Sequence, residues 1–163
     1  MKILIVSDTH RNDKNLKTVL ERTAPIDMLI HLGDIEGSED VIRSWLDPKT
    51  KFVAVKGNND FFSSLDTEKE MTIGKYKVLL THGHLYSISL GVEMLRQETI
   101  ARGFDIAMFG HTHRPFFEDE NGVVILNPGS LSYPRQEGRQ PSFMIMELDR
   151  KGEAHFALNY LED

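Results

Sequence analysis

The stretch KILIVSD, residues 2–8, decides the fold because it is a continuous apolar and β-branched run that ends abruptly in polar residues. A run without polar alternation is typical of a strand that is buried on both faces, as in a parallel sheet. The segment NLKTVLERT (15–23) follows it, and its Leu16, Val19 and Leu20 recur at helical spacing. The chain therefore begins with a strand, a loop and a helix, the repeating unit of α/β proteins.

The same order of elements recurs further along the chain. DMLIHLGD (27–34) predicts a second strand, SEDVIRSWL (38–46) a helix, and KFVAVKGNND (51–60) a third strand that runs into a loop. Residues 68–83 predict two strands joined at Gly74, residues 89–103 a helix and residues 104–110 another buried strand. From residue 114 onward only strands and turns are predicted, with hairpin signals at Asn121-Gly122 and Lys151-Gly152. The pattern predicts an α/β sandwich, in which two layers of sheet have helices outside them.

Composition limits the classes of protein to which the chain can belong. With 163 residues, 40% hydrophobic and 27% charged, we expect a single globular domain over 1–163. The formal charge of −6 argues against general nucleic-acid binding, which needs dense Lys and Arg patches. The absence of cysteine leaves His, Asp, Glu and Asn as metal ligands. No stretch has the length of a signal sequence or a membrane span, so we expect a cytoplasmic protein without a membrane partner.

A set of ligand-type side chains follows the carboxyl ends of the predicted strands. Ligands bind at this edge of open α/β sheets because the loops converge there. Each side chain alone has an ordinary explanation, such as capping a helix or shaping a turn. Together they indicate a metal site. Its members are Asp8, His10, Asp34, Asn58, His82, His111 and His113.

Seven ligands exceed the roughly four to six donors that a single ion of this kind takes. Two ions about 3.5–4 Å apart that share a bridging carboxylate would use all of them. Asp34 has two oxygens and can bridge, while Asn58 supplies a neutral amide oxygen. Two divalent cations outweigh the charge of two aspartates, so the centre would attract an anionic ester. The sequence therefore favours a small phosphate ester as the substrate, and nitrogen and oxygen ligands without sulfur admit Mn, Fe, Ni, Co or Zn.

The two histidines of FGHTHRPF (109–116) are one residue apart at the end of a predicted strand. Alternate residues of a strand project in the same direction. We therefore expect an extended backbone here to point the rings of His111 and His113 at one region while Thr112 faces away.

Six short motifs carry a resemblance to a known family: SDTH (7–10), GD (33–34), GNND (57–60), THGH (81–84), GHTH (110–113) and NPGS (127–130). In order and spacing they resemble the calcineurin-like metallophosphoesterase family over nearly the whole chain, and more narrowly its YfcE-type small prokaryotic phosphodiesterases. The resemblance implies a four-layer αββα sandwich of two mixed sheets flanked by helices. It also implies hydrolysis of phosphate esters, most often diesters, by a hydroxide that bridges two divalent metal ions, with Mn favoured.

The resemblance further implies how the ligands divide between the two ions. One ion would be held by Asp8, His10, Asp34 and His113. The other would be held by Asp34, Asn58, His82 and His111. Asp34 and Asn58 are also expected to take part in catalysis, because they hold the reacting centre.

One position departs from the larger phosphatases of the family. They carry a histidine, thought to protonate the leaving group, where this chain has Asn59, and an asparagine cannot act as a general acid. His84 is the candidate replacement, with support of a neighbouring ligand or simple solvation as the alternatives. His31 and His155 are expected to be structural, and Asp60 is expected to hold its loop or a histidine ring rather than bind metal.

Alternatives from other classes fit the sequence less well. The family includes a retromer subunit that serves chiefly as a protein scaffold, but His10 and both GHTH histidines favour an enzyme. A metallo-β-lactamase signature would continue from HxH to a nearby Asp-His, which HTHRPF does not. No GxGxxG follows the first strand, which argues against a dinucleotide oxidoreductase. Specificity is assigned to the loops at Phe61-Phe62, Tyr86 and Tyr133–Arg139, while the physiological substrate and a homo-oligomer are left open.

Overall fold

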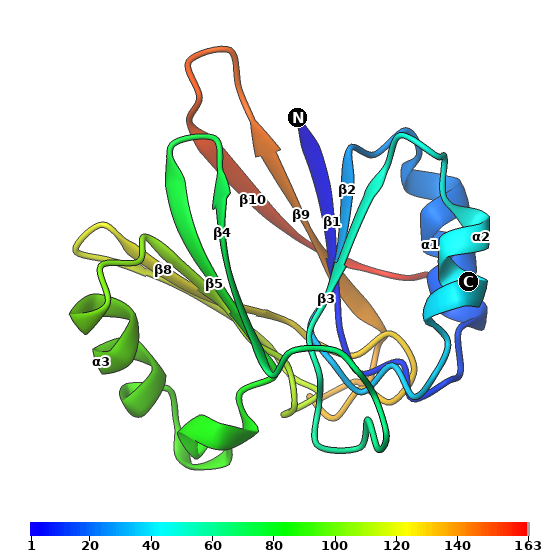
Figure 1. Cartoon of the computed structure of the whole chain (residues 1–163), viewed down its shortest axis with the longest axis horizontal. Helices are drawn as coiled ribbons and strands as arrows, with labels where there is room; N and C mark the ends of the chain where they lie inside the picture. Colours follow the sequence, from blue (N-terminus) through cyan, green and yellow to red (C-terminus); the bar gives the residue numbers. More distant parts are fainter. Residues whose placement is uncertain (163) are drawn as a thin grey trace.

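Two mixed β-sheets face each other at the centre of the protein, and helices cover their outer faces (Figure 1). The computed structural model describes residues 1–162. The first sheet has the order β10-β9-β1-β2-β3, in which β1, β2 and β3 are parallel and β9 is antiparallel to both β1 and β10. Its strands are β1 (Lys2–Val6), β2 (Met28–His31), β3 (Lys51–Ala54), β9 (Ser142–Leu148) and β10 (Ala154–Tyr160).

The second sheet has the order β4-β5-β6-β8-β7, with β5, β6 and β8 parallel and the two edge strands antiparallel. Its strands are β4 (Glu68–Ile73), β5 (Tyr76–Thr81), β6 (Ile106–Met108), β7 (Pro115–Glu120) and β8 (Val123–Pro128). Helices α1 (Lys14–Thr23) and α2 (Glu39–Trp45) cover the first sheet, and α3 (Glu93–Ala101) covers the second. The predicted four-layer αββα sandwich is confirmed.

The apolar side chains of the first strand divide between two cores, as a strand buried on both faces requires. Ile3 and Ile5 belong to the core between the sheets, whereas Leu4 and Val6 pack in the core beneath α1 and α2. A third core lies under α3. Alternate side chains of β1 therefore point to opposite faces of the first sheet, so this strand packs against the second sheet on one face and against α1 and α2 on the other.

The strand registers bring the loops that carry the predicted ligands to one end of the molecule. In the first sheet Val6 pairs with His31, and His31 pairs with Ala54, so the three carboxyl ends are nearly level. In the second sheet Leu80 of β5 pairs with Met108 of β6. The loops after these strands gather at the lower end of the view in Figure 1.

The predicted helix over 89–103 is shorter than expected. A 3₁₀ turn occupies Ile88–Leu90, and Gly91 has φ +132°, a conformation that no helix contains. The α-helix therefore begins only at Glu93. None of the helices within residues 1–162 combines the length and the apolarity that a bilayer span requires.

Candidate metal centre

The structure brings the predicted ligands together from both sheets. Loops after β1, β2 and β3 supply one part of the set, and loops after β5 and β6 supply the histidines that face it. The ligand atoms of Asp8, His10, Asp34 and His113 lie within 4.8 Å of one another, and those of Asp34, His82 and His111 form a second such group. Asp34 belongs to both groups, so the two candidate sites are adjacent.

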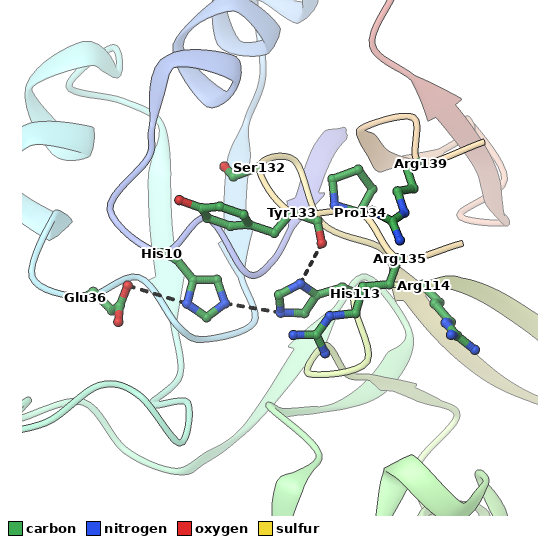
Figure 2. Close-up of a pocket in the computed structure, with 9 residues that line it drawn as sticks. All are labelled: His10, Glu36, His113, Arg114, Ser132, Tyr133, Pro134, Arg135 and Arg139. Carbon is green, nitrogen blue, oxygen red and sulfur yellow. Dashed lines mark hydrogen bonds and ion pairs between the residues drawn. The ribbon is translucent and has the colours of Figure 1, made fainter. Parts of the chain in front are cut away.

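The first group is arranged around the ring of His113. Its Nε2 atom lies 3.2 Å from Asp8 Oδ1. It also lies 3.2 Å from His10 Nε2 (Figure 2). His10 Nε2 lies 3.5 Å from Asp34 Oδ2. The nitrogen and oxygen lone pairs of this group therefore converge on one small volume.

The second group is arranged around the ring of His82. Its Nε2 atom lies 3.3 Å from Asp34 Oδ2 and 3.2 Å from His111 Nδ1. Asn58 joins this group, because its Oδ1 lies 3.0 Å from His82 Nε2 and 3.1 Å from His111 Nδ1. All seven predicted ligands thus lie in two adjoining clusters.

Backbone carbonyls fix the orientation of two of the histidines. His82 Nδ1 lies 2.7 Å from the carbonyl oxygen of Leu32, and His113 Nδ1 lies 2.7 Å from that of Tyr133. A carbonyl only accepts hydrogen bonds, so both Nδ1 atoms donate and both Nε2 atoms face the clusters. This is the arrangement by which proteins orient histidine ligands toward a metal.

One buried oxygen lacks the partner that a cation would supply. Asp8 Oδ2 accepts hydrogen bonds from Ser7 Oγ at 2.6 Å and from the His111 N–H at 2.9 Å. Asp8 Oδ1 is buried and has no hydrogen-bond partner within residues 1–162. Buried polar atoms are rarely left unpaired. The oxygen and nitrogen donors around Asp8 Oδ1 fit a divalent cation such as Mn, Fe, Ni, Co or Zn.

Five of the predicted ligands have a backbone conformation that non-glycine residues rarely adopt. The φ angles are 55° at Asp8, 47° at His10, 57° at Asp34, 71° at His111 and 59° at His113. The HxH backbone is therefore left-handed rather than extended, although the two rings still point at one region, where the two adjoining groups share Asp34. Such conformations are unfavourable and gather where the surrounding structure holds a functional site in place.

Asp60 ties together the two loops that hold Asp34 and Asn58. Its carboxylate accepts hydrogen bonds from the backbone N–H groups of Gly57 (2.7 Å), Asp34 (2.8 Å) and Glu36 (2.7 Å). These contacts support the expectation that Asp60 holds its loop.

Asn59 contacts Asp34 directly, which the sequence did not indicate. The backbone N–H of Asn59 donates to Asp34 Oδ1 at 2.8 Å, and its side-chain amide donates to Asp34 Oδ2 at 3.0 Å. Gly57 permits this close approach, because a Cβ atom at that position would overlap Asp34 Oδ1. The residue that replaces the phosphatase histidine therefore orients the carboxylate shared by both groups.

The pKa values of the aspartates are lowered. Burial by itself raises the pKa of Asp34, but the hydrogen bond and charge of His82 and the donors of Asn59 hold it well below its usual range. The pKa of Asp8 is also lowered, because contact with His113 and the charge of His82 outweigh its burial. Both carboxylates are therefore ionised at neutral pH and attract cations.

The pKa values of two histidines in the second group move in opposite directions. Burial opposes the charged form of His82, but Asp34 and Asp8 beside it raise its pKa to about 9. The pKa of His111 is lowered by burial and by the charge of His82. A proton therefore competes with a cation for the ring nitrogen of His82 more strongly than for that of His111.

The remaining histidines lie outside the two groups. His84 lies beside them, with its ring centroid 5.5 Å from that of His82, and its Nδ1 is buried without a partner within residues 1–162. Burial and the charge of His82 lower the pKa of His84, which favours its neutral form. His31 accepts from the Gly33 N–H and lies 2.9 Å from Thr9 Oγ1, and His155 pairs with Asp149 at 2.9 Å, as structural residues would.

A cavity of about 950 Å³ opens beside the first group (Figure 2). The loop over Tyr133–Arg139, to which the sequence assigned specificity, forms one wall of it. The lining residues are His10, Glu36, His113, Arg114, Ser132, Tyr133, Pro134, Arg135 and Arg139. A space of this size accommodates a small-molecule substrate.

Comparison with known proteins identifies the family to which the chain belongs. Residues 1–151 match the model of the calcineurin-like phosphoesterase superfamily domain. The chain therefore belongs to the calcineurin-like phosphoesterase superfamily, as its motifs indicated.

Individual relatives narrow the assignment within the superfamily. The probable metallophosphoesterase YsnB of Bacillus subtilis is 35% identical over 150 residues, which cover 91% of this chain and 85% of YsnB. The phosphodiesterase YfcE of Escherichia coli K12 is 28% identical over an alignment that covers 91% of this chain and 89% of YfcE. The crystal structure of a single mutant of Vps29 from Entamoeba histolytica superposes with a TM-score of 0.77 at 25% identity, covering 99% of this chain and all of Vps29. The YfcE-type resemblance is thus confirmed.

Proposed function

We propose that the protein is a metal-dependent phosphodiesterase that hydrolyses small phosphate esters with two divalent cations held by the seven clustered ligands. The observation that carries the proposal is the position of Asp34, whose carboxylate is common to both ligand groups. Membership of the phosphoesterase superfamily supports the reaction class. The name of the relative YfcE supports diesters over monoesters.

The proposed ligands divide as the family resemblance implies. Asp8, His10, Asp34 and His113 would hold one cation. Asp34, Asn58, His82 and His111 would hold the other. When bound, the two cations would supply a shared hydroxide that attacks phosphorus and would neutralise the charge on the phosphate oxygens.

The residues of the chain prepare the site for this chemistry. The carbonyls of Leu32 and Tyr133 accept hydrogen bonds from Nδ1 of His82 and His113, so that the Nε2 atoms of both rings point toward the proposed cations. Asn59 holds the Asp34 carboxylate by two hydrogen bonds. Because these contacts exist before substrate binds, little reorganisation is needed at the moment of reaction. Mn is the proposed cation, with Fe, Ni, Co and Zn as alternatives admitted by the same ligands.

Hydrolysis is expected to depend entirely on added divalent metal, because in the proposed reaction the two cations supply the hydroxide that attacks phosphorus. Chelated protein is assayed with bis(p-nitrophenyl) phosphate and p-nitrophenyl phosphate after addition of each candidate metal. We expect no turnover after chelation, the largest recovery with Mn, and a higher kcat/KM for the diester. Full turnover by chelated protein, with its metal content verified by elemental analysis, would contradict the proposal.

A scaffold function is the second candidate, because the structure superposes on Vps29 over its whole length. The same assay separates the two functions. A scaffold predicts no turnover with any metal on any ester of the panel, even where metal binding is measured by calorimetry. An enzyme predicts turnover that appears together with metal binding.

The loss of the His84 ring is expected to impair cleavage of poor leaving groups selectively. Asn59 cannot donate a proton, so aryl esters, whose phenoxides leave unprotonated, should be cleaved much faster than alkyl esters. The lowered pKa of His84 makes its protonated form a stronger acid but a minor one at neutral pH. His84→Ala should therefore lower kcat for alkyl esters by about tenfold, less than the roughly 10²–10⁴-fold typical of general acid catalysis because the protonated form is a minor one, and change aryl turnover little.

The control for this prediction is His155→Ala, which removes an exposed histidine at the far hairpin. Rates are compared for methyl p-nitrophenyl phosphate and dimethyl phosphate, whose leaving groups differ widely in basicity. An equal loss on both esters would exclude His84 as the proton donor and assign it to support of the neighbouring ligands.

A further inference from the structure

Three arginines gather on one side of the cavity beside the first ligand group. Arg114, Arg135 and Arg139 line the cavity, and Figure 2 shows them across it from Glu36. Arg114 directly follows His113, and the Arg135 N–H donates to the His113 carbonyl at 3.0 Å. The backbone thus attaches two of these arginines to a proposed metal ligand.

The guanidinium groups of these three arginines have no partner within residues 1–162. Other arginines of the chain donate to backbone carbonyls or carboxylates: Arg11, Arg22, Arg43, Arg96 and Arg102. No hydrogen bond or ion pair of the described residues involves the guanidinium groups of Arg114, Arg135, Arg139 or Arg150, and Arg150 lies in the hairpin turn between β9 and β10. The unpaired guanidinium groups are therefore concentrated at the cavity.

This concentration of positive charge contrasts with the rest of the molecule. The chain carries a formal charge of −6, yet among the described residues Glu36 is the only acidic one in the lining of the cavity. Glu36 lies 3.5 Å from His10 Nδ1, on the opposite side from the arginines. The arginine side of the cavity is thus suited to an anion separate from the one that the metal centre would bind.

The rest of the cavity leaves room for the organic part of a substrate between the candidate metal centre and the arginines. Tyr133 is 48% exposed, and its ring stands edge-on to that of His10 at a centroid distance of 5.5 Å. A cavity of about 950 Å³ lies at the upper end of the range for small-molecule sites and holds a nucleotide-sized ligand. Guanidinium groups bind phosphate through two parallel hydrogen bonds, which gives both affinity and orientation.

We propose that Arg114, Arg135 and Arg139 form a subsite for a second phosphate, so that the preferred substrates are phosphodiesters whose esterified group carries a further phosphate. This inference rests on the proposed function, because it places the scissile phosphate at the metal centre. The second phosphate would lie on the arginine side of the cavity, away from Glu36. Tyr133 would form the wall against the group that joins the two phosphates.

The experiment compares two substrates that differ only in the distal phosphate. These are p-nitrophenyl thymidine 5′-phosphate and the same ester with a 3′-phosphate, and both release p-nitrophenolate. With Mn present, we expect kcat/KM to be about tenfold or more higher for the 3′-phosphorylated ester, as charge-assisted hydrogen bonds at a partly exposed site provide. The preference should shrink as NaCl is raised, because exposed charges are screened.

The triple variant Arg114→Gln, Arg135→Gln, Arg139→Gln should bring this ratio close to one. Arg150→Gln is the matched control and should keep the wild-type ratio, because Arg150 is exposed and remote from the cavity. Equal kcat/KM of wild-type protein for the two esters would overturn the subsite. A triple variant that retains the preference, or that loses activity equally on both esters while its melting temperature is unchanged, would overturn it as well.

A binding measurement keeps this test separate from the test of the proposed function. If neither ester is hydrolysed with any metal, the proposed function fails. Calorimetry then compares thymidine 3′,5′-bisphosphate with thymidine 5′-monophosphate on Mn-loaded protein. Tighter binding of the bisphosphate, lost in the triple variant, would support the subsite, whereas equal affinities would overturn it.

Discussion

Asp34→Asn is expected to reduce metal-dependent hydrolysis by more than about 100-fold, which is beyond the usual effect of losing a group that merely supports a ligand. The Asp34 carboxylate belongs to both ligand groups, and its Oδ2 atom faces both His10 and His82. An amide offers one oxygen and no charge. The variant would therefore weaken both proposed metal sites at once.

The fold should tolerate this substitution. Asp34 has φ 57°, and asparagine adopts this left-handed conformation about as readily as aspartate. We expect circular dichroism to be unchanged, while elemental analysis shows fewer metal ions per chain. Asp119→Asn, at an exposed position on β7, controls for the loss of one negative charge. A folded Asp34→Asn variant with wild-type turnover and metal content would contradict the two-metal proposal.

Asp60→Ala is expected to lower both stability and activity, although Asp60 is not a proposed ligand. Truncation leaves the N–H groups of Gly57, Asp34 and Glu36 without their acceptor. A buried donor left unsatisfied costs about 1–3 kcal/mol, so we expect the free energy of unfolding to fall by about 3 kcal/mol or more. This is a large share of the ~5–15 kcal/mol by which domains are stable.

Urea unfolding followed by circular dichroism measures the change in stability, with Asp66→Ala at an exposed loop position as the control. The loops after β2 and β3 would also move apart, so metal affinity should fall even where the variant is folded. A loss of stability below about 1 kcal/mol, less than the usual cost of one unsatisfied buried donor, would show that water replaces the carboxylate without strain. Asp60 would then not be the residue that fixes these loops.

Much of the fold could be predicted from the sequence because several of its strands are continuous apolar runs bounded by polar residues. Residues 3–6 of KILIVSD are all apolar, so they predict a strand with a core on each side. The positions of the predicted ligands followed from the same reasoning, since each comes shortly after such a run. The helix over 89–103 was less well predicted, because Gly91 interrupts a sequence whose apolar spacing continues through it.

The finer geometry of the centre could not be predicted, for a physical reason. The left-handed backbone at His111 and His113 is not favoured by their own side chains but is imposed by the surrounding loops. The contact of Asn59 with Asp34 likewise depends on how closely two loops approach. Local sequence carries propensities, whereas these features arise from contacts between segments that are distant along the chain.

The two sheets meet through apolar side chains such as Ile5, Leu80 and Met108. The proposed ligands come from both sides of this interior, so its thickness sets the gap between the halves of the centre. Enlarging or trimming a core side chain would shift one half against the other without touching a ligand. The interior thus separates the two sets of proposed ligands, and we expect the volume of its side chains to influence the spacing within the proposed metal centre.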